Sequence, residues 1–136
     1  NALSIREGSN DYIIFNTTDN AEQVEVKQNM DVTGSITLSG SIKSKKNTVT
    51  ATTYTVTGDD EFIIFTSGSS VTVTLPDITS DYEGHRLLLV RQGAGTVTIN
   101  CDGSDTFDGS VSSIELTNQH DRVQLISDGT DIWYLI

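Results

Sequence analysis

Apolar residues alternate with Thr, Ser and charged residues along most of the chain after residue 49. A period of two is typical of β-strands that bury one face, and Gly, Asp, Asn and Ser cluster between the runs, where they favour turns. The pattern predicts strands at residues 49–56, 62–66, 71–75, 85–91, 96–101, 113–116, 122–127 and 132–136. Such closely spaced strands predict an all-β domain, a compact β-sandwich or barrel-like head.

Two glycine-containing turns are expected to be tight hairpins. Residues 128–131 separate the last two runs, and Gly129 can take the positive φ that such turns require. Residues 93–95 are interpreted in the same way. Residues 78–84 are expected to form one short helical turn at most.

The N-terminal region predicts strands of its own at residues 3–5, 12–15 and 24–26. The segment 8–15 resembles the segment 58–65, since each is a polar turn followed by a continuous apolar run. Chance recurrence of one strand pattern explains this echo as well as duplication does.

Residues 32–42 repeat the triplet Gly-Ser-Ile at 34–36 and 40–42. Apolar residues separated by small ones cannot bury themselves within one chain, but equivalent strands from neighbouring chains can bury them around an axis. We therefore expect Ile36, Leu38 and Ile42 to be buried between neighbouring chains. The predicted division is a first segment, residues 1–48, and a second segment, residues 49–136. The boundary at residues 43–48, which contains Lys43, Lys45 and Lys46, is expected to be a solvated linker.

Composition and charge limit the partners of the chain. It has 8 Lys+Arg against 19 Asp+Glu, a net charge of −11, which repels phosphate backbones and argues against nucleic-acid binding. The apolar runs are too short to span a membrane. An apolar fraction of 35% predicts a thin core that gains burial by oligomerisation. Without an initiator Met or a signal segment, the chain is expected to be a piece of a longer protein.

Residues suited to catalysis are sparse, and no cofactor or enzymatic activity is expected. His85 and His120 have no partner at metal-ligand spacing and are interpreted as surface residues. Cys101 is the single cysteine, so it has no disulfide partner within the chain, and its alternation with Val97 and Ile99 indicates a small buried residue.

Two acidic groups leave alternatives open. The carboxylates at 59–61 are a solvated turn or, less favoured, part of a glycosidase pair. Asp102, Asp105 and Asp108 have oxygen ligands at intervals that could surround a hard cation, but they lack the terminal bidentate Glu of a helix-loop-helix calcium site. The alternative is two consecutive turns with Phe107 pointing inward.

The terminal aromatic residues, Trp133 and Tyr134, should point to opposite faces of one strand. One should pack inward, and the other should face a neighbouring chain or stack on a sugar.

A fixed order of motifs runs through the chain: strand, glycine turn, acidic turn, strand and a hairpin that ends in an aromatic residue. They lie at residues 73–77 (VTLPD), 84, 87–90 (LLLV), 95–99 (GTVTI), 102–109 (DGSDTFDG) and 123–133 (VQLISDGTDIW). This order resembles a C-terminal module of bacteriophage tail-fibre and related virion proteins. Residues 2–15 through 32–36 look like the shaft repeats that precede such modules in marine and cyanobacterial phage structural proteins.

The resemblance implies an intertwined homotrimeric, mostly β structural protein on the exterior of a virion, with Ile36, Leu38 and Ile42 in the trimer core. It also implies an extended β shaft or collar at residues 1–48 and a head at residues 49–136. Its N-terminal segment would bind other virion proteins, and its head would contact a host-surface glycan or protein, or only cap the fibre. The alternatives are a capsid head fibre or decoration protein and, less favoured, a glycan hydrolase. For adhesion, the expected contact regions are the loops 102–109, 117–121 with His120, and 128–131 with Asp128, together with whichever of Trp133 and Tyr134 is exposed.

Overall fold

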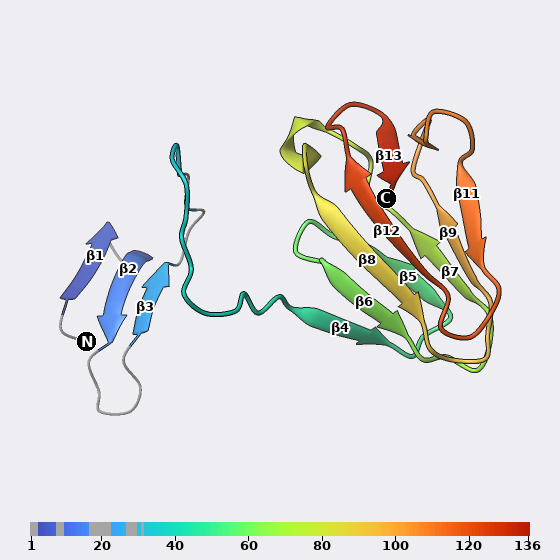
Figure 1. The fold of residues 1–136 in the computed structure, drawn as a ribbon, viewed down its shortest axis with the longest axis horizontal. Coiled ribbons are helices and arrows are strands. Elements are labelled where there is room, and N and C mark those ends of the chain that lie inside the picture. Colours follow the sequence, from blue (N-terminus) through green and yellow to red (C-terminus); the bar gives the residue numbers. More distant parts are fainter. Residues whose placement is uncertain (1–2, 8–9, 17–22, 27–29, 31) are drawn as a thin grey trace. The chain divides into compact units, whose positions relative to one another are not determined.

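The computed structural model describes residues 3–7, 10–16, 23–26, 30 and 32–136 (Figure 1). The chain divides into two units, Asn1–Ile42 and Lys43–Ile136. The division falls before the predicted boundary at residue 48, because strand β4 (Lys46–Val49) pairs with β6 (Phe62–Phe65) in the second unit. The prediction of a solvated linker is therefore wrong for residues 46–48.

The first unit contains a three-stranded antiparallel sheet. Strands β1 (Leu3–Glu7) and β3 (Gln23–Val26) flank β2 (Asn10–Asn16). The strands expected at 3–5, 12–15 and 24–26 are confirmed. Residues 32–45, all of them described, form no strand within this single chain.

The second unit is a two-layered β-sandwich, which agrees with the expected all-β class. Its six-stranded sheet has the order β10-β13-β12-β8-β6-β4, and its four-stranded sheet has the order β11-β9-β7-β5. The remaining strands are β5 (Thr53–Thr55), β7 (Val71–Thr74), β8 (Arg86–Arg91), β9 (Val97–Asn100), β10 (Thr106–Phe107), β11 (Ser113–Leu116), β12 (Arg122–Ser127) and β13 (Ile132–Leu135). A 3-10 turn, Ser80–Tyr82, is the short helical turn expected between 78 and 84.

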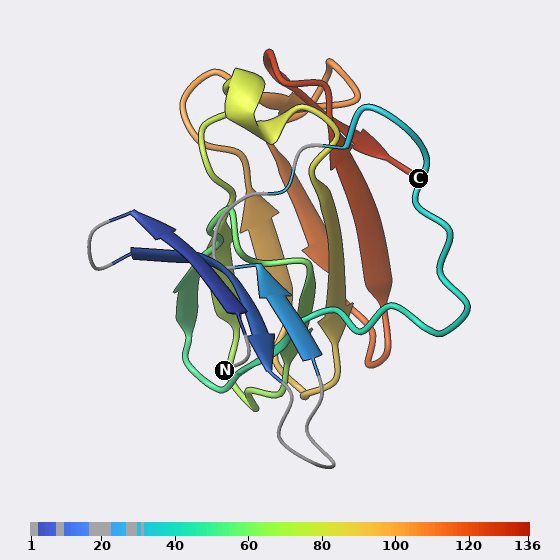
Figure 2. The ribbon, with the colours of Figure 1, turned by 90° about the vertical axis from the view of Figure 1, so that its left-hand side faces the viewer.

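Successive strands alternate between the two sheets from β4 to β9, so the chain winds as a flattened coil (Figures 1 and 2). Strands two apart in sequence become parallel neighbours. Val49 pairs with Phe65 and Phe65 with Arg91 in one sheet, while β5, β7 and β9 are stacked in the same way in the other. The predicted strand at 49–56 is divided between β4 and β5, because the chain crosses between the sheets at residues 50–52.

The hairpin predicted at residues 93–95 is not formed. Strands β8 and β9 belong to different sheets, so the segment crosses between layers. Its glycines allow close approach to the preceding coil: a Cβ on Gly93 would lie 2.0 Å from the Ser67 carbonyl oxygen, and one on Gly95 would lie 1.8 Å from that of Ser69. Both distances are far shorter than van der Waals contact, so only glycine fits.

Antiparallel strands complete both sheets at the C-terminal end of the coil. Strand β11 pairs with β9, and β12 pairs with both β8 and β13. The hairpin expected at 128–131 is confirmed, with Gly129 at φ 77°. Strand β10, which pairs in parallel with β13, lies inside the region expected to be only an acidic loop.

The core lies between the two sheets and consists of inward-facing aliphatic side chains with Phe65, Phe107 and Trp133.

Cys101 is half-buried against this core. Burial, and secondarily the charge of Asp105, raises the pKa of the Cys101 thiol to about 12, so it stays protonated at neutral pH. The interpretation of Cys101 as a small packing residue agrees with this environment.

Candidate functional site

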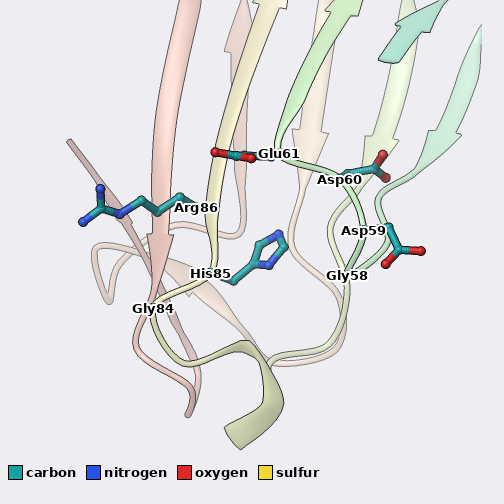
Figure 3. Close-up of a pocket in the computed structure, with 7 residues that line it drawn as sticks. All are labelled: Gly58, Asp59, Asp60, Glu61, Gly84, His85 and Arg86. Atoms are coloured by element: carbon teal, nitrogen blue, oxygen red, sulfur yellow. The ribbon is translucent and has the colours of Figure 1, made fainter. Parts of the chain in front are cut away.

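A shallow pocket at one end of the sandwich is lined by charged side chains and a histidine. The segments 58–61 and 84–86 line a cavity of about 360 Å³ (Figure 3). The first segment precedes β6 and the second leads into β8. Because these two strands are parallel neighbours, the chain ends that enter them lie side by side. The pocket therefore contains the acidic group 59–61 together with His85 and Arg86.

Asp60 is the buried member of that acidic group, and its carboxylate is fully occupied by the fold. It accepts hydrogen bonds from the Asn47 amide, the Tyr54 hydroxyl (2.9 Å), the Thr57 backbone N–H (2.9 Å) and the Thr57 hydroxyl (3.1 Å). Burial, and then the hydrogen bond to Asp60, raises the pKa of the Tyr54 hydroxyl. This network ties β4 and β5 to the turn before β6.

The remaining side chains of the pocket do not converge on a common point. Asp59 and Asp60 point away from Arg86, while His85 and Arg86 leave opposite sides of the chain at the start of β8 (Figure 3). A glycosidase needs two carboxyl groups facing one another at a defined separation. The Asp60 carboxylate is occupied, and the Asp59 and Glu61 side chains point in opposite directions (Figure 3), so the group 59–61 does not supply such a pair.

His85 is not the surface residue that the sequence suggested. It is half-buried, with its ring edge-on to Tyr82 (centroids 5.5 Å apart) and to Trp133 (6.2 Å). Its Nε2 atom is buried without a hydrogen-bond partner, as is the Nε1 atom of Trp133. A ligand in the pocket therefore cannot reach the Nε2 atom without a rearrangement.

The three acidic candidates for a cation site serve three different purposes. Asp102 accepts a hydrogen bond from the Gly103 N–H (2.9 Å), buried Asp105 from the Ile78 N–H (2.8 Å), and Asp108 from the Leu135 N–H (3.0 Å). Burial raises the pKa of the Asp105 carboxyl. Among the described residues, no group of three or more His, Cys, Asp or Glu side chains is placed to hold a metal ion. The alternative of consecutive turns, with Phe107 pointing inward, describes this segment.

The adhesion candidates differ in accessibility. Trp133 is fully buried, so its assignment as a receptor or interface contact is wrong, whereas Tyr134 is 44% exposed on the opposite face. The expected orientation of the two rings is confirmed. The Asp128 carboxylate accepts hydrogen bonds from the backbone N–H groups of residues 130–132, which lower its pKa, so it organises the hairpin.

His120 is exposed in the loop 117–121 and adopts a positive φ of 73°. Its backbone N–H donates to the Arg91 carbonyl oxygen (2.7 Å). Asp121 accepts hydrogen bonds from the backbone N–H groups of Asn118 and Thr117, and these bonds lower its pKa. The loop is thus an ordered turn that presents the His120 side chain to solvent.

One surface was missed by the reasoning from sequence. The outer side of the six-stranded sheet carries a group of apolar side chains, which we call the apolar face: Phe62, Ile64, Leu88, Val90, Ile126, Tyr134 and Ile136. The signal was present in the continuous apolar runs of β6 and β8, since strands with one solvated face alternate instead.

Comparisons with protein-family models, curated proteins and solved structures found no match to this chain. Within the described part of the chain, no helix is long and apolar enough to cross a membrane. The function is therefore proposed from the residues and the geometry alone.

Proposed function

We propose that this chain is a non-enzymatic structural component of a bacteriophage fibre, in which three copies assemble and the sandwich forms the distal head. The resemblance in motif order points to a phage fibre, and the observation that carries the assembly of copies is a set of exposed apolar side chains. Ile36, Leu38 and Ile42 are 57%, 56% and 76% exposed in the single chain, although they recur in a repeated pattern. Apolar residues placed in this way are covered when chains meet around an axis.

The chemistry of the sandwich supports a structural role. Asp60 and Asp105, one from each of the two acidic groups singled out by sequence, are buried and hydrogen-bonded to their own chain. The loops 117–121 and 128–131 are held by side-chain-to-backbone hydrogen bonds, which gives a head with fixed loops. Repetition of such loops in three copies would provide avidity for a host surface without a deep pocket.

The mass in solution tests the proposal. Light scattering on a size-exclusion column should give three times the chain mass of 14.7 kDa. A monomer at all accessible concentrations would overturn the homotrimer. Labelling the protein on phage particles would then distinguish a tail fibre from a capsid head fibre or decoration protein.

A further inference from the structure

The apolar face occupies the middle of the six-stranded sheet. Phe62 lies beside Leu88, and Ile64 lies beside Val90, in two adjacent rows across β6 and β8. All four side chains are half-buried. Two shallow grooves flank them: one of about 290 Å³ includes Phe62 and Leu88, and one of about 430 Å³ includes Leu88 and Ile136. Gln124 lies beside Leu88 on β12, so the apolar cluster of β6 and β8 is bounded by a polar side chain on that side. An apolar cluster rimmed by polar residues on an outer surface is typical of a protein–protein contact.

The charges around this face differ from those of the whole chain. None of the six strands contains Asp or Glu, although the chain carries 19 acidic residues against 8 basic ones. Lys46, Arg86 and Arg122 project beside the apolar rows, as the alternation along their strands requires. Glu61, which directly precedes β6, is the acidic residue that lines the same groove as Arg86. Apart from Glu115, every acidic residue of the sandwich lies outside its strands. The same chain therefore supplies both an apolar, cation-edged face and the acidic loops that complement it.

We propose that the apolar face is the surface through which copies of this chain assemble, with the acidic loops of one copy close to Arg86 and Arg122 of the next. This inference rests on the proposed homotrimer and specifies which surface of the head forms it. Local charge complementarity favours another copy as the occupant, because each copy presents acidic loops that can pair with the cations beside the apolar face. A cyclic assembly repeats this contact at each interface.

The test places the same new charge on each side of the sandwich. Leu88→Glu introduces a carboxylate in the centre of the apolar face, and Thr72→Glu introduces one at the exposed centre of the other sheet. Light scattering should give a mass near one chain for Leu88→Glu and an unchanged trimer for Thr72→Glu. The dissociation constant of the Leu88→Glu variant should rise by at least tenfold, because a buried unpaired charge costs several kcal/mol.

Folding is monitored through Trp133, which is the single tryptophan and is fully buried. Its emission should stay blue-shifted in Leu88→Glu, which shows that dissociation occurs without unfolding. Should that variant unfold, Leu88→Asn provides the milder change, with the same expected loss of trimer.

The outcomes separate the two proposals. A monomeric wild-type chain would overturn both the homotrimer and this interface. A wild-type trimer that persists in folded Leu88→Glu and Leu88→Asn would overturn only the interface, and would leave assembly to the segment around Ile36, Leu38 and Ile42. Dissociation by Thr72→Glu as well as by Leu88→Glu would also overturn the assignment, because the effect would not be specific to one face.

Discussion

The two outer faces of the sandwich are opposites in chemistry, although both sheets share one apolar core. The outer side of the four-stranded sheet carries Thr53, Thr72 and Thr98 in register, and the Thr98 hydroxyl donates to Glu115 (3.3 Å). At the corresponding positions of the six-stranded sheet lie the aliphatic and aromatic side chains of the apolar face. Strand alternation is visible only where one face meets water, so its absence from β6 and β8 indicates a second covered face.

The largest expected effect contrasts the two sides of one strand. Leu89 is fully buried in the core, so Leu89→Ala should lower the free energy of unfolding by about 2–5 kcal/mol at any protein concentration. Leu88→Ala should cost much less in dilute protein, where the outer face is uncovered, and more as the concentration rises. Denaturant unfolding of both variants over a range of concentrations measures this. Equal, concentration-independent losses would contradict the difference between the faces.

A smaller effect is expected where successive coils touch. Gly95→Ala should destabilise the sandwich by about 1–3 kcal/mol, because its Cβ would overlap the Ser69 carbonyl and force the coils apart. Gly68→Ala is the matched control, since nothing lies within 4 Å of its Cβ position, and we expect a change within about 0.5 kcal/mol. Thermal unfolding compares the two. A tolerated Gly95→Ala would show that the sheets do not depend on this close stacking.

The network around Asp60 should give an effect of similar or slightly lower size. Asp60→Ala removes the acceptor of the Tyr54 hydroxyl and of the Thr57 N–H, leaves the Asn47 amide with only the Tyr54 hydroxyl, and should cost about 1–3 kcal/mol. It should also lower the pKa of Tyr54, measured by ultraviolet titration of the phenolate, because one cause of the raised value is removed.

Asp59→Ala is the control for that experiment, since Asp59 is exposed in the same turn. We expect it to leave both the stability and the Tyr54 titration nearly unchanged. If the two variants behaved alike, the Asp60 network would not be the tie between β4 and β5 that its hydrogen bonds indicate.

The smallest expected effect concerns pH. Burial raises the Asp105 pKa, so the folded chain binds this proton more tightly than the unfolded chain does. The Asp105 contribution to stability therefore falls as pH rises from the unfolded value of about 3.9 toward the raised folded value. Asp105→Asn removes this titration while keeping an oxygen for the Ile78 N–H. The free energy of unfolding of the variant should therefore increase relative to that of the wild type as pH rises across that window.

Asp121 and Asp128 change the pH dependence of stability in the opposite direction to Asp105. Their lowered pKa values give stability that is present above about pH 3.9 and is lost as pH falls through the folded values. They are unchanged in Asp105→Asn, so the difference between the two proteins isolates Asp105. Denaturant unfolding from pH 4 to 7 measures it, and parallel stability curves would show that Asp105 does not titrate with a raised pKa.

Local sequence was a good guide to strands and a poor guide to sites. Alternation correctly predicted that Trp133 and Tyr134 face opposite ways, and the Asp128-Gly129 turn signal correctly predicted a hairpin, because both features depend on adjacent residues. Asp60 and Asp105 looked like candidates for catalysis or cation binding. Asn47, which donates to Asp60, and Ile78, which donates to Asp105, are distant in sequence, and only folding brought them to the carboxylates.

Two segments of similar sequence show which structural features local sequence does not predict. Residues 12–15 (YIIF) and 62–65 (FIIF) both form strands, as the shared pattern predicts. Strand β2 pairs with two antiparallel neighbours, whereas β6 pairs with two parallel ones. The preference for an extended backbone is set by each side chain and its neighbours, so the sequence by itself determined the strands. Pairing direction, the crossing at residues 93–95 and the apolar face depend on contacts between distant segments, so only the tertiary structure decided them.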